Sequence, residues 1–577
     1  MSYVADVGIS ILTIIILAVS LNLLLGFAGQ FSQAHAVFYG IGAYTAALAM
    51  INAGLPLVIA VICGIAAAFV FAWFIAIPAV KRVQGEFIIL LTIAFQMVVN
   101  QLFVTLKFTG GAYGLMGIPP IELGGKLSYP QYVFWLYVVF TVVVILICSR
   151  VGNSPFGRLL KGIREDEEAV RSLGKKTVGK KLITFGFSAA IAGFIGGMNA
   201  AYLQFIAPTQ YDLDYSIFII SAIVLGGMGN IKGSVIGAII IGLIEPLLNQ
   251  IPNIGHDAFA WQHAIFGIML VVLMFVRPQG LLPERFIPGK RTLQALNSTG
   301  SKTEETFVPG VFIKEDQTNG TDVWKRTPVV SVSGMSKRFG GIQAVQDITF
   351  DLQYNKITAL IGPNGAGKTT IFRLMVGTHK PDTGTVKLYG KNITGKEPEQ
   401  VAQDGMVRSF QDVRLFRQLS VLENIAMAIP GQKGENLVSL FVSPKNSDEI
   451  EAEIQKKAID YLRIVGMQDK AFHIVNNLSY GETKLVAIAR LLATECEVLL
   501  LDEPMSGVDP SAVDEMLAVI KRLKDVGKTV CIIEHSLHVV EQLADHVIFL
   551  ESGRVLAEGS LEELQSQNEL VQSYFGV

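Results

Sequence analysis

The sequence predicts a multi-domain fold, in which an all-α polytopic transmembrane domain is followed by an α/β domain. Two observations support this prediction. Long apolar runs dominate the first half of the chain, whereas charged residues recur in the second half as they do in soluble α/β proteins. Residues 362–369, Gly-Pro-Asn-Gly-Ala-Gly-Lys-Thr, follow a short apolar run and match a phosphate-binding loop. We therefore expect a transmembrane domain in residues 1–282, a linker in 283–328 and an α/β P-loop domain in 329–577.

The composition excludes an ordinary soluble protein and gives no reason to expect a nucleic-acid partner. The 577 residues are 51% hydrophobic and 17% charged, with a mean hydropathy of +0.46. A formal net charge of −2 lacks the basic excess of nucleic-acid-binding proteins. The four cysteines have no metal-binding spacing, so we expect core thiols in a reducing compartment: Cys63, Cys148, Cys496 and Cys531.

Nine apolar segments are candidates for the membrane, where a spanning helix needs about 20 mostly apolar residues. They are 8–27, 33–50, 55–80, 86–107, 131–149, 182–204, 216–229, 234–250 and 262–276. We expect eight or nine membrane segments, because 216–229 is short and ends in a glycine-rich turn. That segment is a short span, a re-entrant helix or a part of the next segment.

Basic residues in the short loops predict the orientation. The loop 150–181 is rich in Lys and Arg, Lys81 and Arg82 mark a second basic loop, and Arg277 follows the last segment. Since cytosolic loops carry the excess of Lys and Arg, these loops and the second half face the cytosol, and the N-terminus lies outside. The first segment has no basic n-region and is followed by further spans, so we expect no cleaved signal peptide.

Polar and small residues within the apolar segments have two interpretations. Polar groups in lipid face either a neighbouring helix or a transport pathway. For His35 we favour an interhelical hydrogen bond over a substrate contact. For Gly193-xxx-Gly197 and Gly233-xxx-Gly237 we favour close helix packing over a broken-helix transport site.

The basic loop 151–181 predicts a helix that lies outside the membrane. Ser154 is a good N-cap, Pro155 suits the first helical position, and Gly174 suits the C-terminal stop. Apolar residues between these ends recur at helical spacing and form a stripe that needs a partner. The helix rests on its own membrane domain or docks on the P-loop domain as a coupling helix, and we favour the second.

The phosphate loop has the strand–loop–helix context that its function requires, since it follows an apolar strand at Ile357–Ile361. Glycines let backbone N–H groups approach the phosphates of ATP, Lys368 reaches the β and γ phosphates, and the Thr369 hydroxyl binds Mg²⁺. The expected ATP-binding residues of this segment are Gly362, Asn364, Gly365, Gly367, Lys368, Thr369 and Thr370.

Two further apolar strands end in residues suited to hydrolysis. Val498–Leu501 is followed by Asp502, which can hold Mg²⁺ through water, and by Glu503, which can polarise the attacking water. Thr529–Ile533 is followed closely by His535, at the strand end where open α/β sheets bind ligands.

The segment 478–482, Leu-Ser-Tyr-Gly-Glu, resembles the signature of ABC transporters, and the second half therefore resembles an ABC nucleotide-binding domain. The resemblance implies that two cassettes enclose two ATP molecules, so that Ser479 and Gly481 act on the nucleotide held by a partner. Glu482 departs from the usual Gln and adds a carboxylate near a phosphate site. The resemblance further implies roles for Gln411 in the Q-loop as a catalytic and Mg²⁺-linked residue, Asp509 in the D-loop, His535 as the switch histidine and Phe339 in adenine stacking.

The likeness extends over nearly the whole chain except the linker. Residues 26–44, 109–115, 225–229 and 277–281 look like the permease of branched-chain amino-acid ABC importers, and 408–411, 421–425 and 574–576 look like the ATPase of that system. The chain resembles a LivM-type permease fused to a LivG-type ATPase. This implies an ATP-hydrolysing importer subunit in the bacterial cytoplasmic (inner) membrane, in contact with membrane lipid. Its implied partners are a LivH-type permease, a LivF-type ATPase or a second copy, and an extracytoplasmic binding protein.

Three alternatives remain open at this point. The same importer class includes systems for urea, amides and aromatic carboxylates. A fused exporter or lipid flippase is disfavoured by the permease motifs. A membrane-tethered ATPase that transports nothing is disfavoured by the intact set of Lys368, Asp502, Glu503 and His535.

Overall fold

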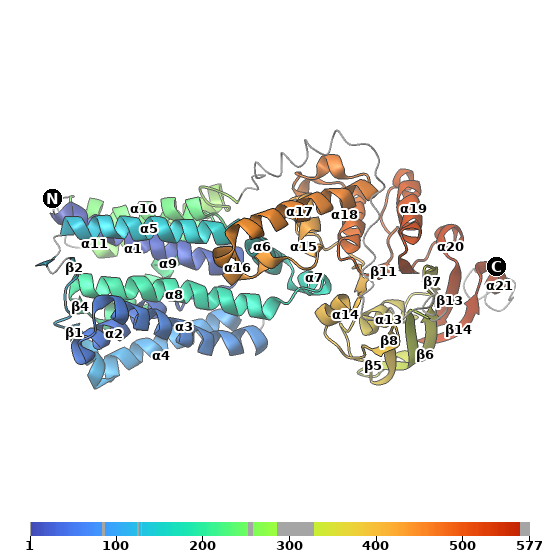
Figure 1. The fold of residues 1–577 in the computed structure, drawn as a ribbon, viewed down its shortest axis with the longest axis horizontal. Helices are drawn as coiled ribbons and strands as arrows, with labels where there is room; N and C mark the ends of the chain where they lie inside the picture. The colour runs from blue at the N-terminus through green and yellow to red at the C-terminus, as the bar shows by residue number, and fades with distance from the viewer. Residues whose placement is uncertain are drawn as a thin grey trace. The chain divides into compact units, whose positions relative to one another are not determined.

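The computed structural model describes residues 2–82, 87–123, 126–127, 130–251, 258–284 and 328–565. These residues fold into two compact units (Figure 1). The membrane unit contains the described residues of 2–164 and 177–284 together with 435–440, and the cassette unit contains 165–176, 328–434 and 441–565. Residues 285–327 of the predicted linker lie outside the described residues, as do residues 574–576.

Each of the nine predicted membrane segments corresponds to a helix. These are α1 (Ser2–Asn22), α2 (His35–Ala53), α3 (Leu57–Arg82), α4 (Phe87–Thr105), α5 (Pro130–Gly152), α8 (Thr177–Leu203), α9 (Leu213–Gly226), α10 (Ile231–Leu248) and α11 (Ala258–Val276). Within the described residues, seven helices are long and apolar enough to cross a membrane, and α9 and α11 are not among them. The 14-residue α9 is a separate helix, because a turn at 227–230 divides it from α10.

Short elements complete the membrane unit. A π-helical turn, η1 (Leu23–Phe27), continues α1, and 3₁₀ turns occur at Lys107–Thr109, Gly111–Tyr113 and Pro208–Tyr211. Two small antiparallel pairs join β1 (Leu115–Met116) to β4 (Phe205–Ile206) and β2 (Glu122–Leu123) to β3 (Lys126–Leu127).

Glycines allow the helices of this unit to approach closely, as the sequence predicts. A Cβ atom at Gly42 of α2 would lie 2.4 Å from the Cα of Gly193 in α8. One at Gly237 of α10 would lie 2.0 Å from the carbonyl oxygen of Ala222 in α9. A larger residue at either position would collide with backbone, so the packing interpretation of these small residues is confirmed.

Buried polar side chains join neighbouring helices of the membrane unit. The Nε2 of His35 lies 3.0 Å from the Ser20 hydroxyl of α1, which confirms the expected interhelical hydrogen bond. Gln96 of α4 donates to the Tyr211 carbonyl at 2.7 Å and accepts from the backbone N–H of Val37 at 3.1 Å. These groups satisfy one another, as buried polar groups in lipid must.

The prediction of one continuous helix in the loop 151–181 is wrong, because the segment forms α6 (Pro155–Glu165) and α7 (Glu167–Ser172). Asp166 between them is extended, with φ −156° and ψ 98°, and its carboxylate accepts from the Ala169 N–H at 2.9 Å. A local side-chain cap thus competes with continuation of the helix. The predicted start and stop of this helical segment are confirmed. The Ser154 hydroxyl accepts from the Gly157 N–H at 3.3 Å, and Gly174 has the left-handed φ of +81°.

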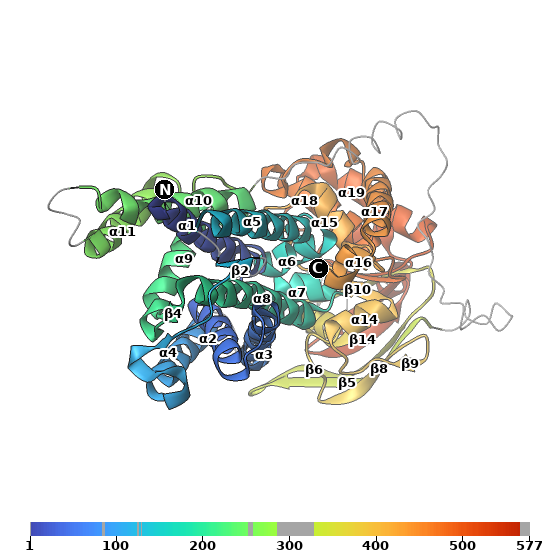
Figure 2. The same cartoon turned by 60° about the vertical axis from the view of Figure 1, so that its left-hand side comes forward.

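The cassette unit is built on two sheets. The larger has the order β10 (Met406–Arg408), β11 (Val498–Asp502), β12 (Thr529–Ile533), β7 (Ile357–Ile361), β13 (His546–Glu551) and β14 (Arg554–Gly559), and only β14 is antiparallel. The smaller is antiparallel, with the order β6 (Ile342–Leu352), β5 (Val330–Phe339), β8 (Thr383–Leu388) and β9 (Lys391–Asn392), which Figure 2 shows side by side. Strands β7, β11 and β12 are buried throughout, as expected for apolar runs covered on both faces.

Nine α-helices lie in the second half of the chain, within the described residues. They are α13 (Lys368–Met375), α14 (Pro398–Asp404), α15 (Val421–Ala428), α16 (Leu437–Val442), α17 (Pro444–Ile464), α18 (Tyr480–Leu492), α19 (Pro510–Asp525), α20 (Leu537–Leu543) and α21 (Leu561–Gln565). Side chains from both sheets and from α13 share one hydrophobic core, which includes Val332, Leu360 and Ile371. This core fixes the loop between β7 and α13 against the sheet, and the predicted fold class is confirmed.

Candidate functional site

The loop 362–367 connects the buried strand β7 to α13 and has the backbone of a phosphate loop. Gly362 has φ +145°, and a Cβ there would lie 2.0 Å from the Leu550 carbonyl oxygen. A Cβ at Gly365, whose φ is +84°, would meet no atom within 4 Å, so the space above the loop is open. Asn364 is exposed, and Gly367, with φ +95°, precedes the first turn of α13. This geometry leaves room for a phosphate chain over backbone N–H groups at a helix N-terminus.

Lys368 opens α13, and its ammonium group lies inside the loop. Its Nζ donates to the carbonyl oxygens of Gly362 at 2.7 Å and Pro363 at 3.0 Å. Burial lowers the pKa of Lys368, and the carboxylates of Glu503 and Asp502 oppose that shift. A cation is therefore directed at the space where the loop can receive phosphates.

Asp502 ends β11 and is buried beside Thr369 of α13. Its Oδ1 accepts from the Thr369 hydroxyl at 3.5 Å, and Thr370 follows in the same half-buried turn. Its Oδ2 pairs with Nη2 of Arg408 at 2.7 Å, and its backbone N–H donates to the Ser409 hydroxyl at 2.8 Å. Burial lowers the pKa of the Arg408 guanidinium, and the contact with Asp502 offsets part of that shift.

The donor set around Thr369 and Asp502 fits Mg²⁺. A hydroxyl and a carboxylate supply hard oxygen ligands, and Mg²⁺ usually combines one or two such groups with phosphates and water. Among the described residues, no cluster of three or more His, Cys, Asp or Glu side chains could enclose a metal by itself.

Glu503, Gln411 and His535 converge although they come from three separate segments. Gln411 Nε2 donates to Oε2 of Glu503 at 3.2 Å, and Nε2 of His535 lies 3.1 Å from Oε1. Glu503 has φ +49°, a left-handed conformation that costs energy for a residue with a side chain. Its backbone is fixed there by an N–H bond to the Ile533 carbonyl at 3.0 Å, so the carboxylate is directed by the sheet.

Two residues that sequence reasoning did not assign to the site contact its backbone, Lys484 at Glu503 and Glu534 at His535. Lys484 of α18 is buried and donates to the Glu503 carbonyl oxygen at 3.1 Å, and burial lowers its pKa. Glu534 accepts from the Met505 N–H at 2.9 Å and from the His535 N–H at 3.3 Å, and burial raises its pKa. The sequence could have indicated Glu534 as a site residue, because it directly follows β12, whereas no sequence pattern indicated Lys484.

The segment 478–482 begins α18. Ser479 is the N-cap, since its hydroxyl accepts from the Glu482 N–H at 3.4 Å while Glu482 accepts from the Ser479 N–H at 2.8 Å. Glu482 also forms an ion pair with Lys470. The hydrogen bonds from Lys470 and from the Ser479 N–H hold the pKa of Glu482 below its usual value. A Cβ at Gly481 would meet only Ala512, at 4.0 Å, so the backbone there is open to a ligand.

The remaining predicted residues, Phe339 and Asp509, form other contacts. Phe339, at the end of β5, is 42% exposed, and its ring contacts His379 at 5.4 Å and the Lys337 ammonium at 5.7 Å. An exposed ring of this kind is available for stacking. Asp509 lies between β11 and α19, and its carbonyl accepts from the Ala512 N–H at 2.9 Å.

Comparisons with known proteins agree with this geometry. Residues 3–274 match the model of the branched-chain amino acid transport system permease component, and residues 345–506 match that of the ABC transporter. The high-affinity branched-chain amino acid transport ATP-binding protein LivG of Salmonella typhimurium is 35% identical over 250 residues, which are 43% of this chain and 98% of LivG. The chain belongs to the branched-chain amino acid ABC transporter family.

Two further relatives resemble the ABC cassette. The high-affinity branched-chain amino acid transport ATP-binding protein BraF of Pseudomonas aeruginosa is 34% identical over 251 residues, which are 43% of this chain and 98% of BraF. A solved ATP-binding cassette of an ABC transporter in its ADP conformation is 32% identical, with a TM-score of 0.38, over 44% of this chain and all of that one. The two family models make the chain a multi-pass membrane protein with an ABC domain that hydrolyses ATP, and the similarity to a Liv-type system implies other transporter subunits.

Helix α7 is part of the ABC cassette unit and is held there by charged contacts. Arg171 pairs with Glu399 at 2.9 Å and with Glu397 at 2.7 Å. Arg414 lies 2.5 Å from Glu168 and 3.6 Å from Asp166. Opposite charges thus alternate between α7 and the cassette, which fixes the orientation of this short helix.

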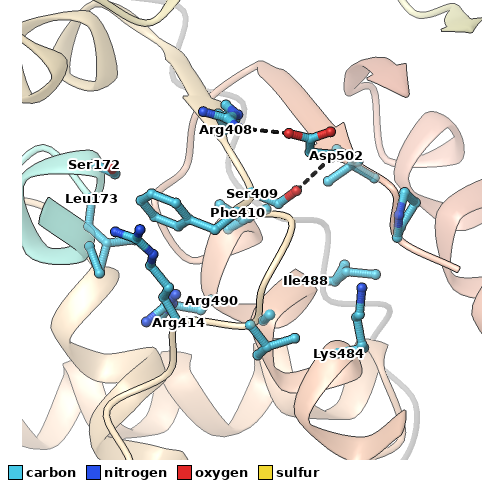
Figure 3. A pocket seen from close by; sticks show the side chains of 16 residues that line it. Ser172, Leu173, Arg408, Ser409, Phe410, Arg414, Lys484, Ile488, Arg490 and Asp502 are labelled. Carbon is cyan, nitrogen blue, oxygen red and sulfur yellow. Dashed lines mark hydrogen bonds and ion pairs between the residues drawn. The ribbon is translucent and has the colours of Figure 1, made fainter. Parts of the chain in front are cut away.

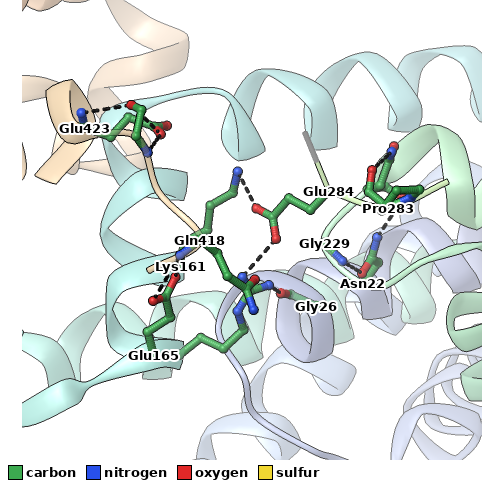
Figure 4. A network of polar contacts seen from close by, with 12 residues as sticks. Asn22, Gly26, Lys161, Glu165, Gly229, Pro283, Glu284, Gln418 and Glu423 are labelled. Atoms are coloured by element: carbon green, nitrogen blue, oxygen red, sulfur yellow. Dashed lines mark hydrogen bonds and ion pairs between the residues drawn. The ribbon is translucent and has the colours of Figure 1, made fainter. Parts of the chain in front are cut away.

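Backbone contacts extend the attachment of α7 on both sides. The Lys175 ammonium is buried and donates to the Ile429 carbonyl at 2.8 Å, and Gln403 donates to the Gly174 carbonyl at 2.7 Å. Before α7, the Gln418 N–H donates to the Glu165 carboxylate at 3.2 Å, as Figure 4 shows.

A small cavity joins α7 to the hydrolysis site of the ABC cassette. Its volume is about 30 Å³, and its walls include Leu173 directly after α7, Phe410 and Arg414 of the Q-loop, and Asp502 (Figure 3). Figure 3 shows the Arg408–Asp502 pair at one edge of it and Ser172 and Leu173 at another. The segment that carries Gln411 therefore lies between α7 and the Asp502 carboxylate that ends β11.

Proposed function

We propose that this chain is the fused permease and ATPase subunit of an ABC importer that takes up branched-chain amino acids delivered by an extracytoplasmic binding protein. One observation carries the proposal: a membrane unit of the branched-chain permease family and a LivG-like cassette with a converged Gln411, Glu503 and His535 occupy one chain. We assign residues 1–282 to the permease domain, 283–328 to the linker and 329–577 to the ATP-binding domain.

In the proposed nucleotide site, the loop N–H groups and Lys368 bind the phosphates, while Phe339 stacks on adenine. Thr369 and Asp502 hold Mg²⁺, with Gln411 as a further ligand, and the bound ion would neutralise charge on the β and γ phosphates. Glu503 accepts a proton from the water whose oxygen attacks the γ phosphorus, while the bond from that phosphorus to the β–γ bridging oxygen breaks and ADP leaves. His535 and Gln411 hold the Glu503 carboxylate in place through the hydrogen bonds described above.

The coupling element of the proposal is α7. Its contact with Arg414 ties it to the segment that carries Gln411, and its contacts with Glu397 and Glu399 hold it at the start of α14. When the γ phosphate is bound or released, Gln411 shifts. This shift displaces α7, and α7 in turn displaces α6 and α8, which flank it in the sequence. ATP binding would thus open the pathway outward, and hydrolysis would reset it.

The importer needs further subunits, because the proposed site uses a signature from a second cassette. We propose a LivF-type ATPase, a LivH-type permease and a binding protein as partners, in the bacterial cytoplasmic membrane with the cassette in the cytosol. In that arrangement, Ser479, Gly481 and Asp509 of this chain complete the site of the partner cassette.

Uptake by cells tests the proposed substrate. Cells that produce this chain with its partner subunits are expected to accumulate labelled leucine, and excess isoleucine or valine should suppress that uptake. If urea, an aliphatic amide or benzoate suppresses the uptake and isoleucine and valine do not, the proposed substrate is wrong, whereas the assignment as an importer stands. Efflux of a preloaded substrate would replace the importer with an exporter.

The Lys470–Glu482 ion pair gives a separate prediction about the signature. Glu482 adds a negative charge near the partner's γ phosphate, and Lys470 compensates for it. Lys470→Ala is therefore expected to raise the ATP concentration for half-maximal hydrolysis by about fivefold, the effect of roughly 1 kcal/mol of a partly exposed pair. Steady-state ATPase assays on the assembled transporter measure it.

The control for this prediction is Glu482→Gln, which removes the charge that Lys470 compensates. In the Glu482→Gln background, Lys470→Ala should have no further effect, and Lys521→Ala on the exposed face of α19 should have none in either background. If Lys470→Ala raises the ATP concentration for half-maximal hydrolysis equally in the wild type and in Glu482→Gln, Lys470 does not act by compensating the charge of Glu482.

A further inference from the structure

Three motifs of the membrane unit that are far apart in the sequence meet at one place. The segment 277–284 follows α11 and runs along the end of α9, where the N–H groups of Leu281 and Leu282 donate to the carbonyls of Leu225 and Gly226, both at 2.9 Å. A Cβ at Gly280 would lie 2.5 Å from the Cα of Gly227. Backbone therefore packs directly on backbone, and this contact leaves no room for larger side chains.

The end of α1 is joined to the same turn by asparagine side chains. Asn22 accepts from the Gly229 N–H at 3.0 Å and donates to the Asn230 carbonyl at 3.2 Å. Asn230 in turn donates to the Pro283 carbonyl at 3.1 Å (Figure 4). Helix α1, the turn between α9 and α10, and the segment 277–284 thus form one hydrogen-bonded junction.

Glu284 connects this junction to α6. Its two carboxylate oxygens pair with the Lys161 ammonium at 2.7 Å and with Nη2 of Arg164 at 2.8 Å. The three side chains are only 15–17% exposed, so solvent screens the interaction weakly. Figure 4 shows the Glu284 carboxylate beside Lys161.

Arg164 also contacts the π-helical turn that continues α1. Its other terminal nitrogen donates to the Gly26 carbonyl of the π-helical turn η1, and the Lys161 ammonium lies 5.2 Å from the centre of the Phe27 ring. Carbonyl groups at the end of a helix carry partial negative charge, so a cation is favoured there. A π-helical turn also marks a place where a helix can change its hydrogen-bond pattern at low cost.

We propose that Glu284 is a positioning residue that fixes α6 to the η1 turn of α1 and to the α9–α10 turn, so that a displacement of α6 reaches both. This inference rests on the proposed function, because Arg164 is followed directly by Glu165, Asp166 and the coupling helix α7. Without the carboxylate, Lys161 and Arg164 would lie one helical turn apart as two weakly solvated cations that repel each other. Arg164 would then leave the Gly26 carbonyl, and the link between α6 and the end of α1 would weaken to the contact of Lys161 with the Phe27 ring.

Hydrogen exchange on the full chain, in lipid nanodiscs with the subunits that copurify with it, tests the inference without a transport substrate. In the wild type, ATP is expected to change exchange in peptides that cover residues 23–30 and 226–230, and also in the phosphate-loop peptide 362–370. In Glu284→Gln, the change at 362–370 should persist, while the change at 23–30 and 226–230 should fall at least threefold. Glu284→Asp, which keeps the charge, should restore a part of it, and Glu122→Gln, an exposed control, should match the wild type.

The outcomes separate this inference from the proposed function. An unchanged ATP response at 23–30 in Glu284→Gln overturns the inference, as does a wild type that responds at 362–370 alone, and either result leaves ATP binding intact. A wild type without a response at 362–370 overturns both. A loss of response at all three peptides in Glu284→Gln would show general damage to the fold and overturn the specific role of Glu284.

Discussion

Glu503→Gln is expected to lower the rate of ATP hydrolysis by about 10²- to 10⁴-fold, the contribution of a positioned general base. The amide keeps the shape of the side chain and can still contact Gln411 and His535, which lie 3.2 Å and 3.1 Å from the carboxylate oxygens. It cannot accept a proton from water. ATP binding should therefore persist within about threefold, and the assembled transporter should hold ATP without turning it over.

Phosphate release and retention of labelled ATP measure the two parts of this prediction. Glu541→Gln, an exposed carboxylate on α20, is the matched control and should behave as the wild type. Hydrolysis at more than a tenth of the wild-type rate by Glu503→Gln would remove Glu503 from the role of main base.

Lys368→Met is expected to abolish tight nucleotide binding, with a loss of about 10²- to 10³-fold in kcat/KM for ATP. Methionine fills the space of the lysine stem but carries no charge toward the phosphates. The carbonyls of Gly362 and Pro363, which accept from Nζ at 2.7 Å and 3.0 Å, also lose their donor. Lys368→Arg should recover little, because a planar guanidinium does not fit between these two carbonyls.

Nucleotide titration of the purified transporter and steady-state ATPase assays check this prediction. Lys356→Met, at an exposed position just before β7, is the control for loss of one positive charge. A Lys368→Met variant that binds ATP within threefold of the wild type would show that the loop backbone alone provides the affinity.

The sequence predicted the parts of the structure that depend on local pattern. Strands β7 and β11 are continuous apolar runs followed by residues with a specific chemistry, so their burial and their ends could be read directly. Helices coincide with the nine predominantly apolar segments, so their order along the chain could be read directly, whereas only seven of them, within the described residues, are long and apolar enough to cross a membrane. The signature could be placed at a helix start because Ser479 and Glu482 have the spacing of a capping box.

Contacts between distant segments could not be predicted. Arg408 and Asp502 are 94 residues apart, and nothing local to Arg408 distinguishes it from a surface arginine. The break at Asp166 was missed because apolar spacing continues across it, while a single capping carboxylate decides the backbone. Glu284 is at the edge of a polar segment that reads as a linker, and only the fold brings it to Lys161 and Arg164.

The central claim is that hydrolysis in the cassette moves a substrate through the membrane unit. The most direct test is leucine accumulation in proteoliposomes that contain this chain with its partner subunits, with the binding protein outside and ATP enclosed. We expect accumulation against a gradient that requires ATP and is absent with Glu503→Gln. Steady ATP hydrolysis by the wild type without accumulation of leucine, isoleucine, valine, urea, an amide or benzoate would contradict the claim.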